Sequence, residues 1–177
     1  PVFLVDDAGN LPDKTASVLL DSGISRAIVA GGNVVVSEYT EGFMQAVTVR
    51  ASGASDVVRC WGETGYDTSN QIAHYLVEKG LLSAANPCVA NGAPDPKGLD
   101  ALAGAALAGK AGSVILLTNP RADLGDSENG CTIKGTDSNG DVAFLTKYAG
   151  AVQDVAILGG TYVMPSSVSS EIKDVLR

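Results

Sequence analysis

The sequence has few aromatic residues and little positive charge. Aromatics make up 5% of its 177 residues, which leaves little surface on which bases or sugar rings could stack. The chain has 12 Lys and Arg residues against 20 Asp and Glu, a formal net charge of −8, and its basic residues form no cluster. Because nucleic-acid binding depends on basic patches, this composition argues against nucleic acid as a partner.

Residues that commonly carry catalysis or bind metals are also scarce. The single histidine, His74, has no serine or cysteine nucleophile motif beside it, and we interpret it as a solvated surface residue rather than a catalytic base. The three cysteines, Cys60, Cys88 and Cys131, lack metal-ligand spacing. We expect Cys60 and Cys88 to be buried small hydrophobic residues rather than a disulfide. The sequence therefore predicts no catalytic residue, cofactor or metal.

Long hydrophobic runs are absent, since none approaches the roughly 20 residues needed to cross a bilayer. The first residues lack the basic and then apolar pattern of a signal peptide, so we expect any export signal to lie outside this sequence. Hydrophobic residues still make up 45% of the chain, enough to fill the core of one substantial domain or two small ones.

A duplicated segment organises what is present. Residues 24–47 overlay residues 152–175 without a gap, and each copy contains a short apolar run, a glycine pair and then helical spacing. Glycine permits a turn through positive φ, and it also bares backbone N–H groups to anions. Because the third glycine of a dinucleotide fingerprint is missing, we assign these residues to structural turns. They are Gly31, Gly32, Gly159 and Gly160.

The fold class predicted from these patterns is α/β. The apolar runs do not alternate with polar residues, which is typical of parallel strands covered on both faces. We expect a mostly parallel sheet flanked by helices and built from repeated strand-turn-helix units, Rossmann-like or Toprim-like. Residues 1–5 are predicted to form an opening strand, and Ser37 is predicted to cap a helix.

The segment from Arg59 to Gly62, followed by Tyr66, Thr68 and Ile72, resembles the opening R-x-x-G-x-x-R-Y-x-T-A motif of a known repeat. This is the type-2 cell wall binding repeat family of Gram-positive surface proteins. Later segments resemble further family motifs in the same order: Leu99–Leu107, Ile115–Leu117, and Val155–Val168 with V-x-I-L-G-G-x-x-x-V-S-x-x-V. Gly65 departs from the family pattern, which has arginine there, and Gly98 and Leu99 replace its Phe-Pro.

This resemblance implies two parts and a function. Residues 1–50 would be the second half of a preceding repeat, and residues 51–177 one complete repeat with an inserted loop at about 119–140. The implied function is a non-catalytic module that anchors a secreted protein non-covalently to the cell wall, through an anionic wall polymer. It also implies self-association or packing with tandem repeats, as trimers, and an extracellular location in the cell wall.

The acidic net charge bears on the implied ligand, because a polyanion would need bridging cations or a local basic groove. The groove is predicted to be formed by lysines together with Arg26, Arg50 and Arg59. Tyr66 and Asp100 are predicted to contribute to polymer binding. Asp100 equally fits a capping role in the first turn of a helix.

Two alternative functions remain open. One is a small-molecule or nucleotide-binding Rossmann-like domain that uses the glycine turns or the loop at 91–97 near strand ends. The other is an oligomerisation or spacer module. In the insert, Asp137, Asn139 and Asp141 resemble part of a calcium loop, but no glutamate follows at the required spacing, so no metal is predicted.

Overall fold

The computed structural model describes residues 2–92, 99–119 and 140–177, and the chain divides into two compact units, Pro1–Gly62 and Glu63–Arg177. Several residues named in the sequence analysis lie outside the described residues. They are Cys131, Asp137, Asn139 and nearly all of the expected inserted loop. The predictions made for them are therefore left as they stand.

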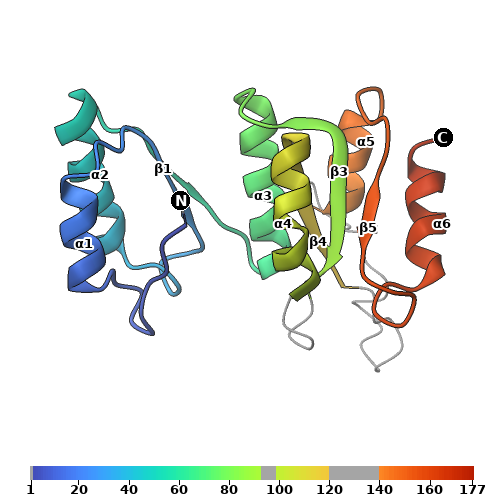
Figure 1. Cartoon of the computed structure of the whole chain (residues 1–177), viewed down its shortest axis with the longest axis horizontal. Helices are drawn as coiled ribbons and strands as arrows, with labels where there is room; N and C mark the ends of the chain where they lie inside the picture. The colour runs from blue at the N-terminus through green and yellow to red at the C-terminus, as the bar shows by residue number, and fades with distance from the viewer. Residues whose placement is uncertain (1, 93–98, 120–139) are drawn as a thin grey trace. The chain divides into compact units, whose positions relative to one another are not determined.

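The first unit holds a pair of parallel strands and two helices (Figure 1). Strand pairing runs from Ala27 opposite Val57 to Ala30 opposite Cys60. A small core, centred on Leu19, Met44 and Val47, joins the helices to this pair because each helix turns its apolar stripe inward. The elements are α1 (Asp13–Leu20), β1 (Ala27–Ala30), α2 (Glu38–Ser52) and β2 (Val57–Cys60).

The described residues of the second unit form a three-stranded parallel sheet with helices on both faces, in the strand order β4-β3-β5. On one face, Val89, Leu116 and Ile157 pack with residues of α5 and α6. On the other, α4 lies so close that a Cβ added to Gly104 would overlap Leu158. The elements are α3 (Gly65–Glu78), β3 (Ser83–Asn91), α4 (Leu99–Ala111), β4 (Ser113–Thr118), α5 (Asp141–Tyr148), β5 (Ala156–Leu158) and α6 (Ser166–Val175).

The α/β fold class predicted from the sequence is confirmed, and so is the placement of the glycine pairs. Gly31 follows β1 and Gly159 follows β5, both at positive φ (125° and 119°), and α2 and α6 come next. Ser37 caps α2 as expected, because its hydroxyl accepts a hydrogen bond from the Thr40 N–H. Pro165 occupies the N-cap of α6, the position that corresponds to Ser37 in the first copy.

The predicted opening strand at residues 1–5 is wrong. Residues 2–5 form no strand, and Val2 and Leu4 are 90% and 79% exposed. The matching segment of the other repeat is β4, which bonds to β3 along its length. The described part of the first unit contains no strand equivalent to β3, so residues 2–5 lack the backbone partner that a strand requires.

The boundary between the compact units falls after the boundary that the repeats suggest. Residues 51–177 read as one repeat in sequence, yet β2, the first strand of that repeat, pairs with β1 in the first unit. Strand pairing therefore crosses the boundary that the sequence predicts between the repeats.

Gly9 generates a first testable prediction. Its φ of 76° disfavours other residues, and an added Cβ would lie 2.7 Å from the Ser37 nitrogen and 2.8 Å from the Val35 oxygen. Gly53 has a similar φ of 81° but open space around it. We expect Gly9→Ala to lower the free energy of unfolding of the first unit by about 2 kcal/mol more than Gly53→Ala does.

Urea unfolding followed by the fluorescence of Trp61, the single tryptophan, reports on this unit. Equal losses in the two variants would contradict the steric argument.

Candidate functional site

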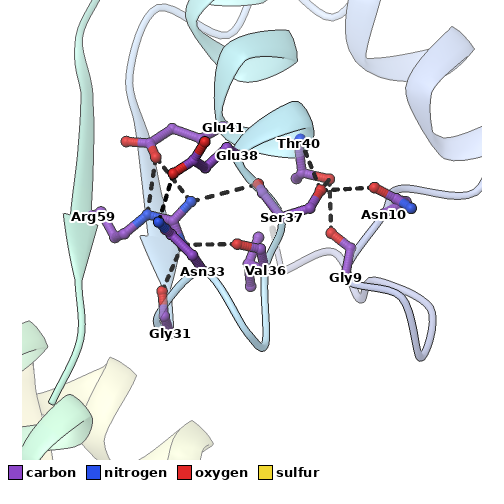
Figure 2. A network of polar contacts seen from close by, with 10 residues as sticks. All are labelled: Gly9, Asn10, Gly31, Asn33, Val36, Ser37, Glu38, Thr40, Glu41 and Arg59. Carbon is purple, nitrogen blue, oxygen red and sulfur yellow. Dashed lines mark hydrogen bonds and ion pairs between the residues drawn. The ribbon is translucent and has the colours of Figure 1, made fainter. Parts of the chain in front are cut away.

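The side chain of Arg59 lies at the centre of a polar network in the first unit (Figure 2). It is 11% exposed and carries five N–H donors. Nε and Nη2 face Glu41 Oε2 at 2.9 and 2.8 Å, while Nη1 donates to the carbonyls of Gly31 at 2.7 Å and Val36 at 2.9 Å. A longer contact of 3.5 Å joins Nη2 to the Ser37 carbonyl. Every donor of Arg59 therefore has a protein acceptor.

The acceptors are held in place by a second layer of hydrogen bonds. The carbonyl of Gly9 accepts from the Ser37 N–H and from the Thr40 hydroxyl, both at 2.9 Å. The Ser37 hydroxyl donates to Asn10 Oδ1 at 2.7 Å (Figure 2). This layer fixes the loop between β1 and α2 together with the first turn of α2, where Glu41 lies.

Through these contacts Arg59 links β2 to the loop that follows β1. A buried guanidinium is stable only when its charge is paired and its donors are satisfied, and both conditions are met here. A polymer phosphate would have to displace Glu41 or a backbone carbonyl to reach it. Polymer binding by Arg59 therefore stays a prediction, and the contacts favour a structural role.

The other two predicted arginines lie elsewhere on the first unit. Arg26, just before β1, pairs with Asp56 at 2.6 Å, and Arg50, in the last turn of α2, faces Asp21 at 3.4 Å. Arg50 and the Arg59 partner Glu41 are near opposite ends of α2, about 13 Å apart along its axis. Arg50 therefore lies away from the Arg59 pair, and each of the three arginines has a carboxylate neighbour.

The remaining predicted residues, Tyr66 and Asp100, belong to the second unit. The Tyr66 ring packs so closely on Gly92 that an added Cβ would lie 2.8 Å from Cε1, and burial raises the pKa of its hydroxyl. Asp100, in the first turn of α4, lies beside the second glycine turn. Its Oδ2 would be 2.8 Å from a Cβ placed on Gly159. The structure thus brings Asp100 and Gly159 together, which the sequence had not indicated.

Sequence reasoning missed a buried polar cluster at the carboxyl ends of β3 and β4. Asn91 and Thr118 end these strands opposite each other, and Asp141 begins α5. Asn70 of α3 donates to Asp141 Oδ1 at 2.8 Å, while Asn70 Oδ1 and Asp141 Oδ2 are buried without a hydrogen-bond partner in the described part of the chain. The sequence signal that could have indicated this cluster is the polar residue at the end of each of the two apolar strands.

Asp141 is the titratable residue of this cluster. Burial raises its pKa from 3.8 to about 7, against the opposing effect of the hydrogen bond from Asn70. The carboxyl ends of parallel strands commonly bind ligands. Within residues 2–92, 99–119 and 140–177, however, no group of three His, Cys, Asp or Glu residues could hold a metal ion.

The interpretation of His74 as a solvated surface residue is wrong. Its ring packs against Phe144 and Tyr148, with centroids 5.0 and 5.6 Å away, and both ring nitrogens are buried. Burial, together with the charge of nearby Lys147, lowers its pKa. The reason is tertiary, because α5 covers the face of α3 that carries His74.

The expected burial of Cys60 and Cys88 is confirmed, and both are free thiols. Burial raises the pKa of each, which keeps them protonated and unreactive at neutral pH.

An apolar groove of about 490 Å³ lies between α3 and α4 over β4. Small residues such as Ala105, Ala108 and Gly109 line it and provide no charged group. Beside it, α4 exposes Leu99, Leu102 and Leu107 at 61%, 75% and 51%. Exposed apolar surface of this kind is typical of a contact with another protein surface.

The family model of cell wall binding domain 2 (CWB2) matches residues 59–169. No curated protein sequence matches the chain. Among solved structures, Cwp6 from Clostridium difficile is similar, with a TM-score of 0.66 and 20% sequence identity over 95% of this chain. The chain spans 22% of the length of that protein, and at this identity the similarity shows the fold alone.

Arg59 generates the second prediction. Replacing it with methionine leaves Glu41 and two carbonyls without their donor, and we expect a loss of about 3 kcal/mol in the free energy of unfolding of the first unit. The matched control is Arg50→Ala, whose side chain is 66% exposed and should cost less than about 0.5 kcal/mol. Urea unfolding by circular dichroism compares them, and a small loss at Arg59 would show that the network is dispensable.

Asp141 generates the third. The folded state binds this proton more tightly than the unfolded state, since the pKa rises from 3.8 to about 7. Its contribution is therefore fully present below about pH 4 and is lost as pH rises through 7. Between pH 5 and pH 8 the parent should therefore lose a few kcal/mol, roughly, of its free energy of unfolding. We expect the Asp141→Asn variant, which has no carboxyl group to ionise at this position, not to show this loss.

The measurement is urea unfolding at both pH values. The exposed control Asp174→Asn should leave the pH dependence nearly unchanged. A parent chain and Asp141→Asn variant with parallel pH profiles would mean that Asp141 ionises normally.

Proposed function

The chain belongs to the cell wall binding domain 2 (CWB2) family, and on that premise we propose that it is a non-catalytic module that anchors a secreted protein to the Gram-positive cell wall through an anionic polymer. The observation that carries the proposal is the family match over residues 59–169. An extracellular, wall-associated location is part of the same proposal. No helix in the described ranges is long and apolar enough to cross a membrane.

The contacts of the nucleophilic and basic residues support a binding role over a catalytic one. The His74 ring packs against the Phe144 and Tyr148 rings, and the Cys60 and Cys88 thiols are buried with raised pKa values. A catalytic nucleophile needs a base within hydrogen-bond reach. His74 is the possible base, and neither of its ring nitrogens has a hydrogen-bond partner among the described residues.

For the polymer contact, we propose the exposed arginines of the first unit. The side chains of Arg26 and Arg50 are 47% and 66% exposed, so a phosphate can approach them while their carboxylate partners turn to solvent. Arg59 is a weaker candidate because its donors are engaged. Tyr66 and Asp100 remain candidates from the family resemblance, although Asp100 would need a bridging cation to meet an anion.

Packing with other repeats is the second part of the proposal. The apolar groove over β4 and the exposed leucines of α4 form a surface that a neighbouring repeat would cover. Self-association, as trimers in the family pattern, would multiply weak wall contacts through avidity.

One observation favours an alternative function. The buried cluster of Asn70 and Asp141 lies where open parallel sheets bind small molecules, and its carboxyl has a pKa of about 7. A small-molecule binder on this sheet is therefore the second candidate. A thermal shift of the chain with nucleotides would support it.

The fourth prediction concerns wall binding. We expect the chain to sediment with purified Gram-positive walls, to lose binding when the anionic polymer is extracted, and to bind less as salt increases. Arg26→Ala with Arg50→Ala should weaken binding several-fold, roughly, through the loss of two phosphate contacts. The control is Arg177→Ala, which removes an arginine of the second unit whose side chain is even more exposed, at 79%.

Light scattering on the same samples gives the mass. A strict monomer that fails to bind walls at every salt concentration would rule out anchoring by this chain and favour the small-molecule alternative.

A further inference from the structure

The two copies of the duplicated unit have the same local structure. Residue by residue, Gly31 corresponds to Gly159 and Val36 to Met164. In the first copy, the Val35 and Val36 N–H groups both donate to the Gly32 carbonyl at 2.9 Å. In the second, the N–H groups of the residues at 163 and 164 donate to the Gly160 carbonyl at 2.9 and 2.8 Å. The turns after β1 and β5 are therefore equivalent in backbone geometry.

The surroundings of the two turns differ. The edge of β1 is covered by β2, and the Ala27 and Gly31 N–H groups donate to the carbonyls of Asp56 and Cys60, each at 2.9 Å. In the sheet of the second unit β5 is an edge strand, bonded to β3 alone among the described strands. Gly159 makes no bond like that of Gly31 within the described residues, and it is exposed where Gly31 is buried.

The strand that covers β1 brings two anchoring side chains. Arg59 donates to the carbonyls of Gly31 and Val36, and the Trp61 ring lies over Gly32, 3.5 Å from the position of a Cβ. At the second turn, nothing lies within 4 Å of a Cβ added to Gly160. The second turn thus presents the acceptors and the open glycine that β2 uses at the first turn.

The two turns also differ in the residue that supplies a nearby carboxylate, which at the first turn is Glu41, the partner of Arg59. Glu41 corresponds to Ser169, so the second copy lacks the acidic residue of α2. Asp100 of α4 instead places its carboxylate against Gly159. Asp100 has no hydrogen bond or ion pair with the described residues. A guanidinium at the Gly159 carbonyl would therefore meet a negative charge, as Arg59 does.

From these observations we propose that the open edge of β5, with the Gly159 and Met164 carbonyls and Asp100, is a docking site for the arginine-bearing first strand of another repeat. The occupant is an extended segment of the type Val57–Gly62, which adds as a parallel strand and inserts its arginine as Arg59 does at β1. Successive repeats are then joined because the first strand of one repeat is added to the sheet of the repeat before it. This proposal goes beyond wall binding and does not depend on it.

The test uses the full chain and a fluorescein-labelled peptide of residues 55–64, with Cys60→Ser to prevent disulfides. We expect saturable binding by fluorescence anisotropy. We also expect about tenfold or greater weakening when the peptide carries Arg59→Ala, because charge-assisted bonds are lost. Amide resonances of residues 155–160 should shift on binding, and those of residues 27–32 should not.

Two chain variants separate the two possible locations of the peptide. Asp100→Ala should weaken binding several-fold, roughly, as expected for an interfacial ion pair, while Glu41→Ala should leave it unchanged. The opposite pattern, with shifts at Gly31 and Gly32, would show that the peptide replaces β2 at its own site, which overturns the proposal. Absence of binding up to about 1 mM overturns it as well. The assay contains no wall polymer, so either failure leaves the anchoring proposal standing.

Discussion

The buried guanidinium of Arg59 is the interaction on which the first unit depends. A two-stranded sheet with two helices buries little apolar surface, since its core centres on Leu19, Met44 and Val47. The arginine joins three parts of this unit that the small core does not hold firmly: the end of β2, the glycine turn after β1 and the start of α2. Its charge is tolerated because Glu41 and the carbonyls replace the lost water.

The position of β2, which carries Arg59, also explains why the compact units and the predicted repeats have different boundaries. The strand that carries Arg59 opens the second predicted repeat, yet it pairs with β1, which belongs to the first. A parallel strand can be shared in this way because pairing requires only a free edge and matching backbone groups. An array built by this rule is held together by backbone bonds at each boundary, whereas surface contacts alone would leave successive repeats loosely joined.

The distribution of charge constrains how the chain could bind the anionic polymer proposed as its ligand. The chain carries a net charge of −8, and each of the three arginines considered faces a carboxylate. The ion pairs differ in burial, and burial decides whether the arginine can contact a ligand. The pairs of Arg26 and Arg50 are exposed and screened by water, so they exchange partners easily, while that of Arg59 is held in place. Affinity for a polyanion would therefore come from several weak contacts rather than one deep site.

The sequence alone determined the strand-turn-helix units, the glycine turns, the Ser37 cap and the family, because these depend on residues close together in the chain. The placement of Asp100 beside Gly159, of His74 under Phe144 and of Asn70 on Asp141 was decided only by tertiary structure, since each pair joins segments distant in sequence. Residues 2–5 show the same limit from the other side: an apolar run becomes a strand only where another strand bonds to it. Arg59 combines both cases. Its motif identified the family, and its role became visible only once β2 was seen paired with β1.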